Sequence, residues 1–131
     1  MTNEWDVLRF FEDAPRALPL YEALEKQVLA AFDEVHIKVQ KTQITFANRH
    51  NFACVWLPGG SGRKLRKDQP EVCLAVTFGL LYRLDSPRIE VATEPYPNRW
   101  THHVLIQQPA EIDGELKSWL REAYDVSAAK R

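Results

Sequence analysis

The fold of this chain is constrained most strongly by residues 41–57, which read KTQITFANRHNFACVWL. Ile44 and Phe46 alternate with smaller or more polar residues, and this two-residue period is typical of a half-buried β-strand. The polar residues 48–51 have the length of a hairpin loop. The strand that follows, over residues 52–57, is apolar on both faces, as expected of a central strand covered on both sides. We therefore expect a β-hairpin near the middle of a sheet.

Apolar residues at helical spacing predict three helices around this hairpin. The first is short and ends at Pro15, with Thr2 or Asn3 as its cap. The second covers about residues 16–32, and the third begins at Pro109, a residue that suits the first position of a helix. Their apolar faces are made by Trp5, Leu8 and Phe11 in the first helix, by Leu20, Leu24, Val28 and Phe32 in the second, and by Ile112, Leu116, Trp119, Leu120 and Ala123 in the third.

The two-residue period predicts about six strands, over residues 35–40, 44–47, 52–57, 72–82, 88–94 and 100–107. The strand over residues 72–82 has small residues on one face, which leaves room for a helix to lie close to it. Strands flanked by helices are typical of the α+β class. We expect one domain over residues 1–131, with two N-terminal helices, a mainly antiparallel sheet and a C-terminal amphipathic helix packed on that sheet.

The charge balance limits the classes of partner. Seventeen Lys and Arg residues against 18 Asp and Glu residues give a net charge of -1, which argues against a surface adapted throughout to nucleic acid. Cys54 and Cys73 lie among apolar residues, so we expect buried, reduced thiols in a cytoplasmic protein. The first residues do not resemble a signal peptide, and no apolar run approaches the roughly 20 residues of a membrane helix. We therefore expect no membrane partner.

Cations, a hydroxyl, imidazoles and an indole occur at the predicted strand ends and loops. If these groups meet at one rim of the sheet, they suit an anionic or nucleobase-containing ligand, because Arg binds phosphate with two parallel hydrogen bonds and Trp can stack on a base. The alternative is that the tryptophans pack in the core and the cations are solvated. The candidate ligand-binding residues are Lys41, Thr42, Arg49, Arg99, Trp100, His102 and His103.

The two adjacent histidines bear on catalysis. Neighbouring residues of a strand point to opposite faces, so His102 is expected inward with Val104 and Ile106, and His103 outward. An enzyme that uses His102 as acid or base is the least supported hypothesis.

The sequence has no metal-ligand spacing and no nucleophile motif, and the glycines at 59–62 do not complete a phosphate-binding loop. We expect a small binding module with no cofactor and no metal.

A basic loop offers an alternative function. Arg63, Lys64, Arg66 and Lys67 follow a glycine-rich stretch and could contact a nucleic-acid backbone without sequence preference. The same loop could equally be a solvated linker whose charges only keep it soluble. Both interpretations stay open at this point.

Three segments together are similar to a known family. They read QKTQITFANRHNFACV, WTHHVLI and EIDGELKSWLREAYD. In them the chain resembles the domain-of-unknown-function family 5655 (DUF5655), for which no activity is established. The matching residues are Lys41, Thr42, Phe52, Ala53, Thr101, His102, Val104, Asp113, Glu115, Leu116, Ala123 and Tyr124. The family often has Arg at the position of His103, and a more basic turn than residues 48–51. The order of helices and sheet is also distantly similar to small bacterial YdhG-like domains.

Overall fold

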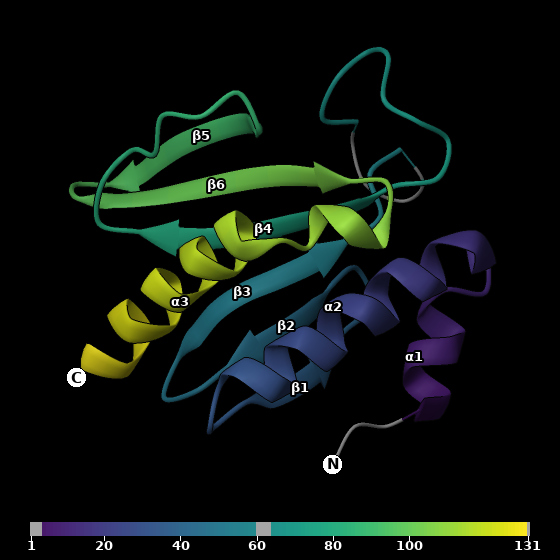
Figure 1. The fold of residues 1–131 in the computed structure, drawn as a ribbon, viewed down its shortest axis with the longest axis horizontal. Coiled ribbons are helices and arrows are strands. Elements are labelled where there is room, and N and C mark those ends of the chain that lie inside the picture. Colours follow the sequence, from purple (N-terminus) through teal and green to yellow (C-terminus); the bar gives the residue numbers. More distant parts are fainter. Residues whose placement is uncertain (1–3, 60–63, 131) are drawn as a thin grey trace.

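A six-stranded antiparallel sheet forms the centre of the protein, with the strand order β1-β2-β3-β4-β6-β5 (Figure 1). The computed structural model describes residues 4–59 and 64–130. The strands are β1 (His36–Val39), β2 (Ile44–Ala47), β3 (Asn51–Trp56), β4 (Leu74–Leu80), β5 (Ile89–Tyr96) and β6 (Arg99–Ile106). The predicted α+β architecture is confirmed, and β3 lies inside the sheet as expected from its apolar sequence.

The helices α1 (Glu4–Phe10), α2 (Leu18–Ala31) and α3 (Gly114–Ala129) are joined by the short 3-10 helices η1 (Pro15–Ala17) and η2 (Pro109–Glu111). Helices α2 and α3 lie on the same face of the sheet (Figure 1). Pro19 is tolerated because it lies in the first turn of α2, where its missing N–H has no helical partner.

The start of α3 differs from the prediction. The Asp113 carboxylate accepts a hydrogen bond from the Leu116 N–H at 3.0 Å, so Asp113 caps the helix and Gly114 is its first residue. Residues 109–111 instead form η2, which is closed by Glu111 Oε1 accepting from the backbone N–H of Gln107 at 2.6 Å. Gly114 therefore does not weaken the helix interior.

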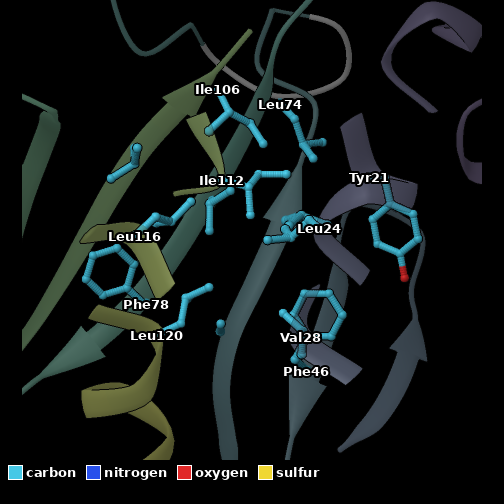
Figure 2. Close-up of a cluster of buried hydrophobic side chains, with 14 of the residues drawn as sticks. Tyr21, Leu24, Val28, Phe46, Leu74, Phe78, Ile106, Ile112, Leu116 and Leu120 are labelled. Atoms are coloured by element: carbon cyan, nitrogen blue, oxygen red, sulfur yellow. The ribbon is translucent and has the colours of Figure 1, made fainter. Parts of the chain in front are cut away.

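The core lies between the sheet and the two long helices. Leu24 and Val28 of α2 and Leu116 and Leu120 of α3 point toward the inward side chains of the strands, among them Phe78 (Figure 2). These aliphatic side chains are all at most 2 % exposed. Burying a side chain of this size stabilises the fold by about 1.5–3 kcal/mol. The predicted apolar stripes of α2 and α3 are confirmed, except that Phe32 and Ile112 pack in the core from just outside the helices.

The predicted apolar face of the first helix is wrong for Trp5 and Leu8 and right for Phe11, which follows directly after α1. Trp5 and Leu8 are 78 % and 50 % exposed, whereas Val7 and Phe11 are buried. The helix is too short to offer a wide face, and its orientation is set by Phe11, whose ring lies 5.5 Å from the ring of Tyr21 on α2. The proposed cap residues Thr2 and Asn3 lie outside the described residues.

The second face of the sheet carries no helix in the described part of the chain. The helix expected beside Cys73, Ala75, Thr77 and Gly79 is absent there, because α2 and α3 both pack on the opposite face. Near one end, Leu65 and Trp56 pack against the pair formed by Ala75 and Leu105. The remaining part, which we call the open face, bears Thr45, Cys54, Thr77, Gly79, Thr101 and His103. The expectation that β3 is covered on both sides is therefore only partly met.

Candidate functional site

A row of small polar side chains crosses the open face. The strand register places Thr45, Cys54, Thr77 and His103 next to one another on four successive strands. Thr45 is only 1 % exposed, and its hydroxyl donates to Gln40 Oε1 at 2.7 Å and accepts from Gln43 Nε2 at 2.9 Å. The hydroxyl at this end of the row is therefore already paired within the protein.

Thr77 lies at the centre of the row. Its Oγ1 accepts a hydrogen bond from Trp56 Nε1 at 2.8 Å and lies 2.7 Å from His103 Nδ1. An indole N–H is only a donor, so the Thr77 hydroxyl proton is directed to His103 or to Cys54. The direction of this proton depends on whether His103 Nδ1 carries a hydrogen.

The thiol in the row is unreactive at neutral pH. Burial raises the pKa of Cys54 to about 11, and the hydrogen bond from Thr77 offsets only part of this effect. A nucleophilic cysteine needs a lowered pKa, because the thiolate is the attacking species. Cys54 is therefore a neutral polar side chain of this face.

A hollow opens where β3 and β4 separate. Their pairing ends at Ala53 and Phe78, and the two strands then diverge while the C-terminal end of α3 reaches the opening (Figure 1). The hollow has a volume of about 240 Å³. It is lined by open-face residues, by strand-end residues, and by α3 residues including Val126, Ser127 and Lys130.

The charge of the hollow is one-sided. Its described lining residues include two cations, Arg99 and Lys130, and neither Asp nor Glu. Among the described residues, the Arg99 guanidinium donates only to the carbonyl of Asn98, at 3.2 Å. The backbone of Asn98, with φ of 62°, forms the tight turn that brings Arg99 to the start of β6. Because its described contacts include no carboxylate, the charge of Arg99 is available to a ligand.

The seven predicted ligand-binding residues do not meet at one rim. Successive hairpin turns of an antiparallel sheet lie at opposite ends, so Lys41 and Thr42 lie far from the turn that holds Arg49. Arg99 and Trp100 line the hollow. His103 does not line it, but is hydrogen-bonded to Thr77, which does. The hollow therefore brings together two of the seven residues directly.

His102 lies on the helix-covered face, as predicted, and is fully buried. Its ring stacks on Phe78 with centroids 5.3 Å apart, and its Nε2 accepts from the Leu84 N–H at 2.9 Å. Burial lowers the pKa of His102, partly offset by the nearby carbonyls of Phe78 and Trp100. A neutral ring with no access to solvent is a structural group, so the geometry does not support His102 as an acid or base acting on a substrate.

Lys41 and Thr42 line a second, larger groove between α1, the β1–β2 turn and the segment before β4. Its volume is about 1160 Å³. Its charges are balanced: the described lining has four cations, Arg9, Arg16, Lys41 and Lys64, and four carboxylates, Asp6, Glu12, Asp13 and Glu71. This groove has no preference for an anion.

The basic loop is also partly neutralised. Arg66 lies 3.4 Å from Glu90 and 3.5 Å from Asp68, measured between nitrogen and oxygen atoms. Lys64 and Lys67 are exposed, and Arg63 lies outside the described residues.

Within residues 4–59 and 64–130 no group of His, Cys, Asp or Glu side chains is placed to hold a metal ion. No helix described here is long and apolar enough to cross a membrane.

Comparison with known proteins identifies the family. The profile of the family described as "Domain of unknown function (DUF5655)" matches residues 8–127. The chain belongs to the DUF5655 family. No curated protein and no solved structure matches it. The resemblance to DUF5655 that three segments of the sequence indicated is thus confirmed, whereas the likeness to YdhG-like domains stays a prediction.

Several residues of the hollow were not predicted from the sequence, among them Thr45, Thr77, Thr101, Gly79 and Lys130. The threonines alternate with apolar residues in the strands of this DUF5655 chain. That alternation signals a polar face of the sheet, but not that the face is hollowed. Lys130 comes from the far end of the chain, and no local pattern connects it to Arg99.

Proposed function

We propose that this DUF5655 protein is a small binding module that holds an anion-bearing small molecule in the hollow between β3 and β4. The observation that carries this proposal is the presence of Arg99 and Lys130 without any carboxylate among the described lining residues. The chain as a whole has a net charge of -1, so a purely cationic lining is not a consequence of composition. Arg and Lys together suit a phosphate or a carboxylate.

The uncharged lining favours a polar ligand body. The Thr101 hydroxyl has no partner among the described residues, and the amide side chains of Gln43 and Asn51 also line the hollow. Hydroxyl and amide groups of a ligand pair well with such side chains. The volume of 240 Å³ is small beside the roughly 300–1,000 Å³ of drug-sized sites. We therefore favour a metabolite such as a sugar phosphate or a small hydroxy acid over a polymer.

A nucleobase-containing ligand is a narrower version of the same proposal. Trp100 and Tyr96 line the hollow, and Tyr96 is 57 % exposed, so a base could stack on the phenol ring. Binding of nucleic acid through residues 63–67 has less support, because Arg66 is already paired with Glu90 and Asp68.

The free thiols Cys54 and Cys73 support a cytoplasmic location for such a module.

The test is an amide-resolved NMR titration with inorganic phosphate, sugar phosphates, small hydroxy acids, mononucleotides and a short oligonucleotide. We expect saturable shifts at residues 51–54, 77–80 and 99–101 with one of the small molecules. Arg99→Gln should weaken that binding at least tenfold, and Lys130→Gln should weaken it less, because a flexible Lys fixes an anion less firmly than Arg.

The matched control is Lys41→Gln, which removes a cation from the balanced groove and should leave the affinity unchanged. Shifts that centre on Lys41 and Thr42 would move the site to that groove. Shifts confined to residues 64–67 that disappear with added salt would favour nonspecific nucleic-acid contact. No shifts with any of the probes would refute the proposal.

A further inference from the structure

Gly79 has no structural reason to be glycine. It lies inside β4 and pairs with Thr101 of β6, in a register that runs without interruption from Leu74 to Leu80. Its φ is not positive, unlike that of Gly59. A Cβ built at Gly79 would meet only the Trp100 carbonyl oxygen, at 3.8 Å, which is an ordinary contact. A methyl group at this position would therefore fit the fold.

Glycine in the middle of a strand is unfavourable, because it loses more conformational freedom on folding and packs no side chain. The usual reasons for its presence are a bulge, a left-handed backbone conformation, or the close approach of another backbone or of a ligand. The regular register excludes a bulge, and the backbone conformation needs no glycine. No described backbone approaches closely either. The remaining reason is the close approach of a ligand to the backbone at Gly79.

We infer that Gly79 keeps open the space for the body of the ligand, which lies against the backbone of β4 between Thr77 and Thr101. This inference rests on the proposed function, since both threonines and Arg99 line the same hollow. Gly79 is thus a residue that determines the size of the accepted ligand.

The backbone beside Gly79 adds a polar contact. In an antiparallel sheet, successive residues direct their N–H and C=O groups to alternate neighbours. Pairing with β3 ends at Phe78, so either Gly79 or Leu80 directs its backbone groups into the gap between β3 and β4. A ligand that lies on Gly79 reaches these groups, whereas a side chain at position 79 would hold it away from them.

The experiment compares Gly79→Ala and Gly79→Val with the wild type, using the small molecule that binds best in the NMR titration. We expect both variants to have an unchanged or higher Tm, because a Cβ at this position makes only an ordinary contact, 3.8 Å from the Trp100 carbonyl oxygen, and replacing glycine restricts the unfolded chain. We expect the valine variant to bind at least tenfold more weakly and the alanine variant to lie between it and the wild type. Gly114→Ala, which adds a methyl group in open space at the start of α3, should change neither affinity nor the pattern of shifts.

The outcomes separate this inference from the proposed function. If Gly79→Val binds as tightly as the wild type while Arg99→Gln does not, the role of Gly79 is refuted and the anion site stands. If either variant has a much lower Tm, glycine is required by the fold, and the inference is also refuted. If Gly79→Val does not fold at all, the inference about Gly79 is refuted for the same reason. If the wild type binds none of the probes, both proposals are refuted together.

Discussion

The hydroxyl of Ser127, in the last turn of α3, donates a hydrogen bond to Asn48 Oδ1 at 2.6 Å across a separation of 79 residues. Asn48 Nδ2 donates in turn to the backbone carbonyl of Tyr124 at 2.9 Å. Both polar side chains are buried, at 2 % and 7 % exposure. The pair fixes the end of α3 to the β2–β3 turn, and Ser127 also lines the hollow.

Asn48→Ala and Ser127→Ala should each lower the free energy of unfolding by about 0.5–1.5 kcal/mol, because each removes a buried hydrogen bond while the remaining group keeps another partner: Ser127 keeps the His50 carbonyl at 2.8 Å, and Asn48 keeps the Tyr124 carbonyl. The double variant should cost less than the sum of the two, since both changes remove the same hydrogen bond. Urea unfolding measures all three values. The exposed Ser118 of the same helix provides the control Ser118→Ala, and strictly additive costs would contradict a direct coupling.

Replacing Thr77 should disturb two neighbours at once. Thr77→Val removes the acceptor of Trp56 Nε1 and the partner of His103 Nδ1, so we expect a loss of about 1–3 kcal/mol and a shifted indole N–H resonance of Trp56. Thr77→Ser keeps the hydroxyl and should keep the resonance near its original position. An unchanged indole resonance in the valine variant would show that Trp56 does not depend on this hydrogen bond.

His102 should make stability depend on pH. Its pKa is lowered in the folded protein by burial and by the charge of Arg83, whereas in the unfolded chain it lies near 6.5. Below pH 6.5 the unfolded chain therefore binds a proton that the folded protein does not. The contribution of neutral His102 is complete above pH 6.5 and declines as the pH falls toward the folded-state pKa, by at most about 1.4 kcal/mol per pH unit.

Urea unfolding at pH 7.5, 6.5 and 5.5 tests this prediction. His102→Gln cannot titrate, so its free energy of unfolding should fall less steeply between pH 6.5 and 5.5 than that of the wild type. The comparison uses the slopes, because the substitution also removes the stacking on Phe78. Parallel slopes for the two proteins would contradict the lowered pKa.

Asp113 should matter mainly as a helix cap. Asp113→Ala removes the acceptor of the Leu116 N–H and one partner of Arg88, whose Nη1 lies 2.9 Å from Asp113 Oδ1. We expect a loss of about 1 kcal/mol in the free energy of unfolding. Asp113→Asn keeps a capping oxygen and should recover most of the loss. Equal losses in both variants would assign the effect to the contact with Arg88 instead.

Cys54 should react slowly with iodoacetamide. With a pKa of about 11 rather than the ordinary 9.0, its thiolate fraction at pH 8 is on the order of 100-fold lower than that of a normal cysteine. Mass spectrometry of digested protein compares its alkylation in folded and urea-unfolded samples. The ligand found by titration should slow the reaction further, because Cys54 lines the hollow. A folded-state rate equal to the unfolded rate would contradict the raised pKa.

The sequence predicted the direction of side chains correctly where the periodicity of a single strand or helix determines it. The alternation around His102 and His103 predicted their opposite faces, and the stripe through Leu116 and Leu120 predicted the inward side of α3. At the first helix the same kind of spacing placed Phe11 correctly but failed for Trp5 and Leu8, because the contact between Phe11 and Tyr21 sets the orientation of a short helix.

The site was harder to predict because it depends on how distant elements meet. Arg99 was named as a candidate, but its partner Lys130 is brought close only by the packing of α3. The grouping of Lys41 with Arg49 could have been avoided from the sequence, since the turns before and after one strand lie at opposite ends of it. The divergence of β3 and β4, which makes the hollow, has no signature in either strand.

The position of β6 between β4 and β5 has a consequence for biosynthesis. The ribosome releases β4 before β6, so the growing chain exposes one complete edge of a strongly apolar strand until residues 99–106 emerge. An exposed edge of this kind can pair with a strand of another chain. A nascent chain that has released β4 but not β6 therefore carries this unpaired edge, and β6 closes it within the chain.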